Sequence, residues 1–222
     1  MIGPVSRKLI AKELYINRLF IWFALIAGLL CLAVSWTSRI AFAIGGIGFI
    51  TIVIAYAVVL AMVSIATERK EKSIIFVMSL PISRAEYVRA KSLGVLLSFL
   101  VPWAVLLVSA VVVIKATLIP DGMILLTVLF MGFVLADFCV LVVALMYAKS
   151  ELVMIPIVII VNVSVTFFLT GVMNLTSVGP AAARDAVAWD TTVLSILGGE
   201  AALMSIAILV FAWLNRRDPD IV

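Results

Sequence analysis

The 222-residue chain lacks histidine, has only two cysteines, and carries little charge, with Asp, Glu, Lys and Arg making up 13% of it. The absence of histidine excludes histidine-based catalysis and metal or haem sites that use histidine ligands. Cys31 and Cys139 lie inside long apolar runs, where cysteine behaves as a small hydrophobic residue, so they predict no disulfide framework. No G-x-x-x-x-G-K-[ST] phosphate-binding motif and no G-x-S-x-G nucleophile motif occurs, so the chain carries neither an ATPase nor a serine hydrolase signature.

Hydrophobic residues make up 66% of the chain, which is typical of a membrane protein. A spanning helix needs about 20 mostly apolar residues. Six stretches qualify, at about residues 19–36, 40–66, 92–114, 123–147, 152–173 and 193–214. Their apolar character is continuous and does not alternate, which excludes a transmembrane β-barrel. The sequence therefore predicts a single all-α transmembrane domain over residues 1–222 with six membrane-spanning helices.

The basic residues are distributed unequally between the two sides of this arrangement. With six spans both termini share one side, and thirteen of the 16 basic residues fall there: Arg7, Lys8, Lys12, Arg18, Arg69, Lys70, Lys72, Arg84, Arg89, Lys91, Lys149, Arg216 and Arg217. Cytoplasmic loops carry such an excess, so we expect both termini in the cytoplasm and the protein in the inner (plasma) membrane. The net charge of +4 reflects this asymmetry, and no nucleic-acid partner is expected.

The segment 68–91, "ERKEKSIIFVMSLPISRAEYVRAK", joins the second and third spans on this basic side. Its apolar middle is too short to span a membrane, and Pro81 divides it. The pattern predicts a short helix over residues 73–79, then a capping box from Ser83 to Glu86 that starts the third long helix near Arg84. This start places Arg89 and Lys91 at the level of the lipid headgroup phosphates. An apolar cluster with a charged rim favours a docking surface for a partner protein. The alternative is packing at the membrane interface.

This segment resembles the permease subunits of type-2 ATP-binding-cassette (ABC) transporters. The residues that match the family pattern are Glu68, Arg69, Leu80, Pro81, Ser83, Arg84 and Lys91, whereas Lys72 departs from it. The resemblance implies that the loop is a coupling helix that inserts into a groove on a separate ATPase subunit. The implied coupling residues are Glu68, Arg69, Ile75, Phe76, Met78, Leu80, Pro81, Ser83 and Arg84. Residues 1–18, with Lys12, Glu13 and Leu14, are similar to the interface helix of the family.

The resemblance also implies a function. The chain would be the permease subunit of an exporter and would form the substrate path by alternating access with a second permease chain, identical or paralogous. ATP and Mg²⁺ would bind the partner ATPase, so no cofactor is expected in this chain. Two alternatives stay open: an integral membrane enzyme that acts on lipids through Asp137 and Glu200, or a non-transporting adaptor or immunity protein.

Three polar residues inside the predicted spans are candidates for the substrate path: Asp137, Asn162 and Glu200. Ionisable groups in a membrane usually face protein or a wet cavity. Asp137 lies past the middle of the fourth span, whereas Glu200 is about two turns into the sixth span from the outer side, so the two need not pair. A buried hydrogen bond to a neighbouring helix is the alternative role of Asp137. The outer loop, residues 174–192, carries Pro180 and is expected to form a short helix.

The predicted topology can be tested with single cysteines in a background that lacks Cys31 and Cys139. Arg84→Cys and Lys149→Cys should be protected from an impermeant maleimide in intact cells, because the basic-residue count places them inside. Lys115→Cys and Arg184→Cys should be labelled. Labelling of position 84 from outside would contradict the whole layout.

Overall fold

The computed structural model describes residues 4–36, 38–67, 84–117, 119–148, 150–187 and 189–217. Within these ranges it has six helices that are long and apolar enough to cross a membrane, which confirms the predicted all-α, six-span class. They are α1 (Pro4–Val34), α2 (Arg39–Ala61), α5 (Arg84–Ala116), α6 (Met123–Tyr147), α7 (Glu151–Asn174) and α9 (Thr191–Arg217). Two short elements complete the described fold: the π-helix η1 (Met62–Thr67) and α8 (Gly179–Ala182).

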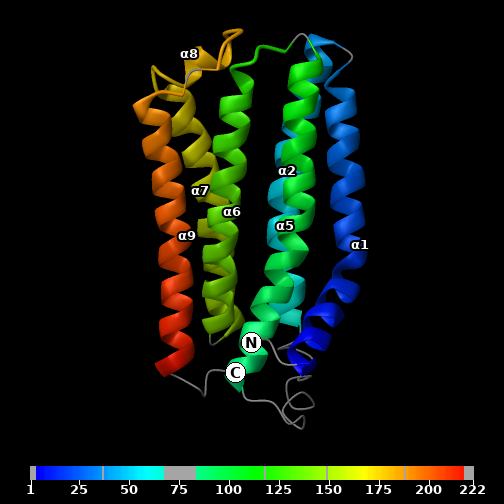
Figure 1. The fold of residues 1–222 in the computed structure, drawn as a ribbon, viewed down its shortest axis with the longest axis vertical. Helices are drawn as coiled ribbons and strands as arrows, with labels where there is room; N and C mark the ends of the chain where they lie inside the picture. Colours follow the sequence, from blue (N-terminus) through cyan, green and yellow to red (C-terminus); the bar gives the residue numbers. More distant parts are fainter. Residues whose placement is uncertain are drawn as a thin grey trace.

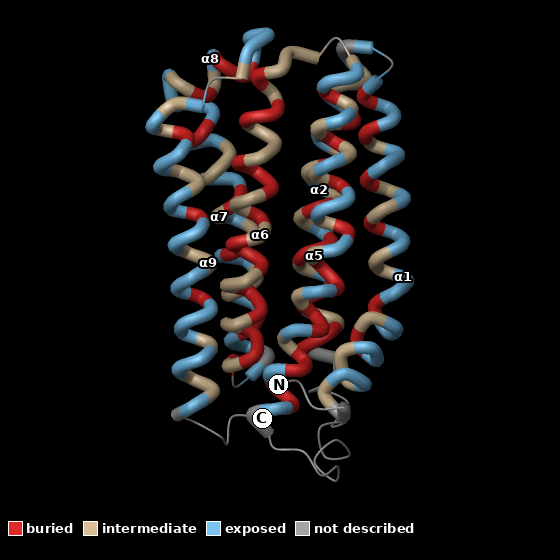
Figure 2. Tube along the Cα trace, in the orientation of Figure 1, coloured by how far each residue is buried: buried red, intermediate tan, exposed pale blue. Residues whose placement is uncertain are grey.

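The long helices stand side by side as one bundle made of two groups (Figure 1). In the first group α1 packs against α5 and α2; in the second α6 packs against α9 and α7. Contacts of α6 with α5 and α2 join the groups. Burial is concentrated on α5 and α6, whereas α1 and α9 present much exposed surface (Figure 2). Because apolar side chains cover that exposed surface, it suits contact with lipid or with another membrane chain.

Helix α1 begins and α9 ends at the same end of the bundle, where η1 also ends and α5 begins (Figure 1). We call this the terminal end, and we call the opposite end, where α8 lies, the α8 end. Residues 68–83, which join η1 to α5, lie outside the described residues.

The N-terminal arm is helical, as expected, but its helix does not end at residue 18. Helix α1 runs without a break from Pro4 to Val34, so the arm and the first span form one continuous helix. The sequence suggested a boundary because Lys12, Glu13 and Asn17 interrupt the apolar pattern. The structure buries Glu13 and Asn17 against neighbouring helices, and this packing allows the helix to continue through them.

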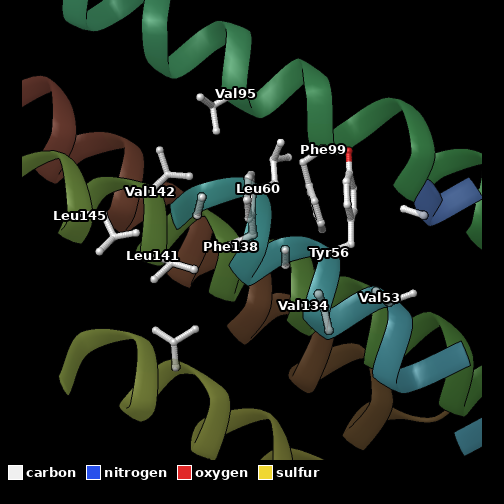
Figure 3. Packing of buried hydrophobic residues seen from close by; sticks show 14 of the residues in the cluster. Val53, Tyr56, Leu60, Val95, Phe99, Val134, Phe138, Leu141, Val142 and Leu145 are labelled. Carbon is white, nitrogen blue, oxygen red and sulfur yellow. The ribbon is translucent and has the colours of Figure 1, made fainter. Parts of the chain in front are cut away.

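An aromatic stack joins the two helix groups through the centre of the core. Tyr56 of α2 stacks on Phe99 of α5 with ring centroids 5.7 Å apart, and Phe99 stacks on Phe138 of α6 at 4.0 Å. The three rings lie in a row among buried aliphatic side chains (Figure 3). Offset aromatic contacts of this kind add to the stabilisation from burial. The stack therefore fixes α2, α5 and α6 relative to one another.

Pro102 interrupts the backbone hydrogen bonding of α5, and the fold compensates. Proline has no N–H group, so the carbonyl oxygen of Ser98, four residues earlier, loses its helical donor. The hydroxyl group of Tyr56 donates a hydrogen bond to that oxygen at 2.6 Å. In an apolar environment an unpaired carbonyl group is costly, and the hydroxyl group of Tyr56 supplies the hydrogen-bond donor that Pro102 lacks.

Short loops close the α8 end of the bundle. The predicted short helix in the loop 174–192 is present as α8, with Pro180 in its first turn. The backbone N–H of Gly122 donates to the carbonyl oxygen of Arg184 at 2.9 Å and ties this loop to the start of α6. The carboxylate of Asp190 accepts from the backbone N–H of Val193 at 2.9 Å, which satisfies one of the free donors at the start of α9.

Candidate functional site

A group of buried polar residues lies near the terminal end, on the helices that flank segment 68–83. It consists of Glu13 and Asn17 of α1, Ser64 of η1 and Lys91 of α5, and the buried Gly94 of α5 lies beside them. We call this group the terminal-end cluster. Because Ser64 precedes the segment and Lys91 follows it, the cluster joins both of its flanking elements to α1.

An ion pair between Lys91 and Glu13 forms the centre of the cluster. The ammonium nitrogen Nζ of Lys91 lies 2.8 Å from Oε1 of Glu13, and their side chains are 4% and 5% exposed. This burial corrects the expectation that Lys91 lies among lipid headgroups. Loss of one partner would leave a buried charge uncompensated, which costs far more than loss of an exposed pair. The pair therefore fixes how α5 leaves segment 68–83.

Gly94 lets α1 approach α5 closely at this pair. A Cβ atom built at position 94 would lie 2.7 Å from the Cβ atom of Glu13, closer than real side chains approach. A larger residue at position 94, which is one turn along α5 from Lys91, would thus push Glu13 away. The glycine is required here for close approach and not for an unusual backbone angle.

Asn17 and Ser64 connect α1 to η1 by reciprocal hydrogen bonding. The distance from Nδ2 of Asn17 to Oγ of Ser64 is 3.0 Å, and that from Oγ of Ser64 to Oδ1 of Asn17 is 3.2 Å. Both residues are buried. A π-helix is less regular than an α-helix and is frequent at functional positions. Here it forms the last described residues before segment 68–83.

Most of the predicted coupling residues fall in that segment. Outside the described residues lie Glu68, Arg69, Ile75, Phe76, Met78, Leu80, Pro81 and Ser83. Arg84 is the first described residue of α5, which agrees with a helix start near Arg84, whereas the capping residue Ser83 lies outside the described residues.

Asp137 is buried in α6 and contacts Ser164 of α7. Oγ of Ser164 lies 3.2 Å and 3.1 Å from the two carboxyl oxygens of Asp137, and 2.7 Å from the carbonyl oxygen of Val161 in its own helix. A hydroxyl group has one hydrogen to donate. If that hydrogen goes to Val161, the shortest contact, a protonated Asp137 is the donor to Ser164. This geometry matches the interhelical hydrogen bond weighed from the sequence.

Asn162 lies near Asp137, on the same small cavity between α2, α6 and α7. The cavity has a volume of about 10 Å³, which is room for about one water molecule. The amide group of Asn162 donates to the carbonyl oxygen of Val158 in its own helix at 3.2 Å. The structure thus brings two of the three candidate path residues together, around a space too small for a substrate.

Glu200 is separated from these two residues. Its carboxyl group packs against Gly132 of α6, five residues before Asp137 and so about 140° around the helix from it. Glu200 is 5% exposed, and its Oε1 atom has no hydrogen-bond partner within the described part of the chain. The separation expected from the sequence is therefore present, and the two acids do not form one site.

The family comparison covers most of the chain. A family model described as ABC-2 family transporter protein matches residues 8–214. The chain belongs to this family. It is therefore an ABC-2 type permease, the membrane component of an ABC transporter and not itself an enzyme. No curated protein and no solved structure matches the chain.

Sequence reasoning missed how this permease organises its terminal end. Glu13 and Lys91 were noticed as parts of a local pattern, but they are 78 positions apart and nothing local pairs them. One signal was available: each is a charged residue near the end of a predicted span, and their charges are opposite. No comparable sequence signal marks Ser64 or Tyr56, because each lies within a run of apolar residues.

The terminal-end ion pair can be tested by charge exchange. Lys91→Glu should lower the free energy of unfolding by about 3–5 kcal/mol, because it places two acids in a buried site. The double variant Glu13→Lys/Lys91→Glu should recover most of that loss. Thermal or denaturant unfolding of the purified permease measures both.

A matched control is available at the α8 end. Lys115 and Asp121 form an exposed ion pair at 2.6 Å, so Lys115→Glu should cost less than about 1 kcal/mol. An equal loss for Lys91→Glu and Lys115→Glu would contradict a structural role of the buried pair.

Asp137 is expected to act as a neutral hydrogen-bond donor. Asp137→Asn should keep the stability of the purified protein, because the amide can also donate to Ser164, whereas Asp137→Leu should lower it by about 1 kcal/mol. Asn162→Leu is the control, since within the described residues its amide bonds only to its own helix. If Asp137→Asn folds normally but inactivates the assembled transporter, a proton-linked role replaces the structural one.

Proposed function

We propose that this permease is the membrane half of an exporter driven by a separate ATPase that docks on segment 68–83. The observation that carries the proposal is the terminal-end cluster, because it joins α1 to both elements that flank the segment. A displacement of the segment would then be transmitted to three helices together. If a flexible linker joined the segment to these helices, the linker would absorb the displacement and the helices would not move.

The orientation follows from the charge asymmetry. Placing the terminal end in the cytoplasm puts segment 68–83 where a cytoplasmic ATPase can reach it. ATP and Mg²⁺ would bind that partner. A second permease chain, identical or paralogous, would complete the transporter in the plasma membrane, because the family operates as an assembly of two membrane halves.

A route for motion within the chain runs along α5. Displacement of its first turns at Arg84 would act on Lys91, then on Ser98 and Phe99, just before Pro102. Proline weakens the helix at this point, so α5 can bend there. The stack of Tyr56, Phe99 and Phe138 would carry the displacement to α6. Alternating access then consists of a tilt of the first helix group against the second.

Asp137 and Asn162 are the two candidate path residues beside this route, since they line one cavity with Phe138. Their cavity, of about 10 Å³, would have to widen for a substrate to use it. Motion between α2 and α6 would widen it, because both helices line it. Glu200 faces α6 from the other side and would line a separate part of any path.

The docking proposal predicts a specific loss of partner binding. Phe76→Asp should weaken binding of the ATPase subunit by about 30-fold or more, because an aromatic anchor at an interface typically contributes 2 kcal/mol or more. Co-purification of the ATPase with the tagged permease, scored against membrane abundance, measures the effect.

Ser150→Asp serves as the control, since it adds the same charge at the same end of the bundle but outside segment 68–83. It should leave co-purification unchanged. If Phe76→Asp retains the ATPase at the parent level, segment 68–83 is not the docking element and packing at the membrane interface takes its place.

A further inference from the structure

Two spaces follow one another between the two helix groups, along the same faces of α2, α6 and α7. The larger has a volume of about 100 Å³ and reaches the loop residue Ile119 at the α8 end. The smaller is the cavity of about 10 Å³ beside Asp137 and Asn162. We call the two spaces together the interhelical cleft. The residues that border the gap between them lie one turn apart on each helix: Ile50 and Ile54 of α2, Phe130 and Val134 of α6, and Leu169 and Val165 of α7.

The larger space is apolar. Among its described walls, the only polar side chains are the hydroxyl groups of Ser35 and Thr127. Each donates its hydrogen at 2.9 Å to a carbonyl oxygen of its own helix region, that of Cys31 or of Met123, so neither hydrogen is free for a ligand. An apolar cavity of roughly 150 Å³ can hold a benzene ring. The larger space, at about 100 Å³, therefore has room for a short alkyl segment.

The smaller space has two polar residues, and both offer hydrogen-bond acceptors. The amide nitrogen of Asn162 donates to Val158, whereas its oxygen makes no hydrogen bond within the described part of the chain. If a protonated Asp137 donates to Ser164 through one carboxyl oxygen, the other oxygen is left to accept. Asp137 is the only ionisable residue among the described residues that line the two spaces. The cleft therefore favours a hydrogen-bond donor at this level and disfavours an anion.

Volume restricts the group that can reach these acceptors. The smaller space has room for about one water molecule, and one nitrogen atom with its hydrogens needs about the same room. The distance along α6 from Phe130, on the larger space, to Asp137 is about 10 Å, so a single extended chain spans both. A primary amine at the end of an alkyl chain meets both conditions.

We propose that the interhelical cleft binds an apolar molecule that ends in a primary amine, with its apolar part in the larger space and its nitrogen between Asp137 and Asn162. This inference rests on the proposed function, for which it names the substrate class. An amine that enters uncharged takes the proton of Asp137, so an ammonium group and a carboxylate form with no change in net charge. Hydrogen bonds between charged partners are about twice as strong as neutral ones, so the amine is preferred to an alcohol of the same length.

A groove on the surface between α1 and α2 is larger, at about 540 Å³, but it lacks such a polar position. Its one described polar side-chain group is the hydroxyl group of Tyr56, which donates to the carbonyl oxygen of Ser98. The groove therefore offers no side chain that selects one occupant, whereas the interhelical cleft does.

Native mass spectrometry of the purified permease without its ATPase tests the proposal, with decylamine, decanol or decanoate at equal mole fraction in the micelles. The parent should bind one decylamine about tenfold more tightly than decanol, and decanoate more weakly than either. Asp137→Asn should abolish the preference for the amine, since an amide keeps the bond to Ser164 but has no proton to transfer. Asp185→Asn, which removes an exposed acid at the α8 end, should keep the preference.

The size of the smaller space provides a second measurement, which uses the parent protein and so decides the proposal even if a variant fails to fold. N,N-dimethyldecylamine should bind several-fold more weakly than decylamine, because its two methyl groups exceed the room beside Asp137. Equal binding of the two amines by the parent would contradict the assignment of the nitrogen to this cavity.

An unchanged amine preference in Asp137→Asn would overturn the proposal. So would loss of the preference in Glu200→Gln with retention in Asp137→Asn, which would place the amine at the contact between α6 and α9. Because the assay needs neither the ATPase nor transport, its failure leaves docking on segment 68–83 intact. Retention of the ATPase by Phe76→Asp would, conversely, leave amine binding intact.

Discussion

The fold of this permease depends on the rule that polar groups buried in an apolar bundle must find partners within the protein, because the surrounding hydrocarbon offers none. The Lys91–Glu13 ion pair is its clearest case, since two opposite charges from distant helices neutralise each other at 2.8 Å. The same requirement explains why the hydroxyl group of Tyr56 reaches the Ser98 carbonyl oxygen that Pro102 leaves without a donor. Such contacts are directional, so they fix the register of helices whose apolar surfaces alone would slide.

The positions of these contacts give the molecule a mechanical layout. The terminal-end cluster ties α1, η1 and α5 together beside segment 68–83, whereas the half of α5 nearer the α8 end lies beyond Pro102. One stiff unit is thus attached to the rest of the bundle through a weakened point and an aromatic stack. That arrangement suits a permease whose driving force is applied at one end. Apolar side chains make up most of the contact between the two helix groups.

The surface of the bundle and its interior differ in the space that they offer. The groove between α1 and α2 is lined by apolar residues along its length. The interior cavity at Asp137 is about 10 Å³, whereas the groove is about 540 Å³. Of these two spaces, the groove is the one large enough for an apolar molecule, and it lies on the surface of the bundle.

The sequence alone determined the class and the six spans, because these depend on composition and on run length. It also located Asp137, Asn162 and Glu200 as unusual, since a polar residue in an apolar run needs no structure to be seen. Only the tertiary structure decided their partners. It put Asp137 with Ser164, placed Glu200 against Gly132, and buried Lys91 where a headgroup contact was expected. Pairing across helices depends on how each helix is rotated and shifted against its neighbours, and that arrangement results from the packing of the whole bundle, which no local stretch of sequence encodes.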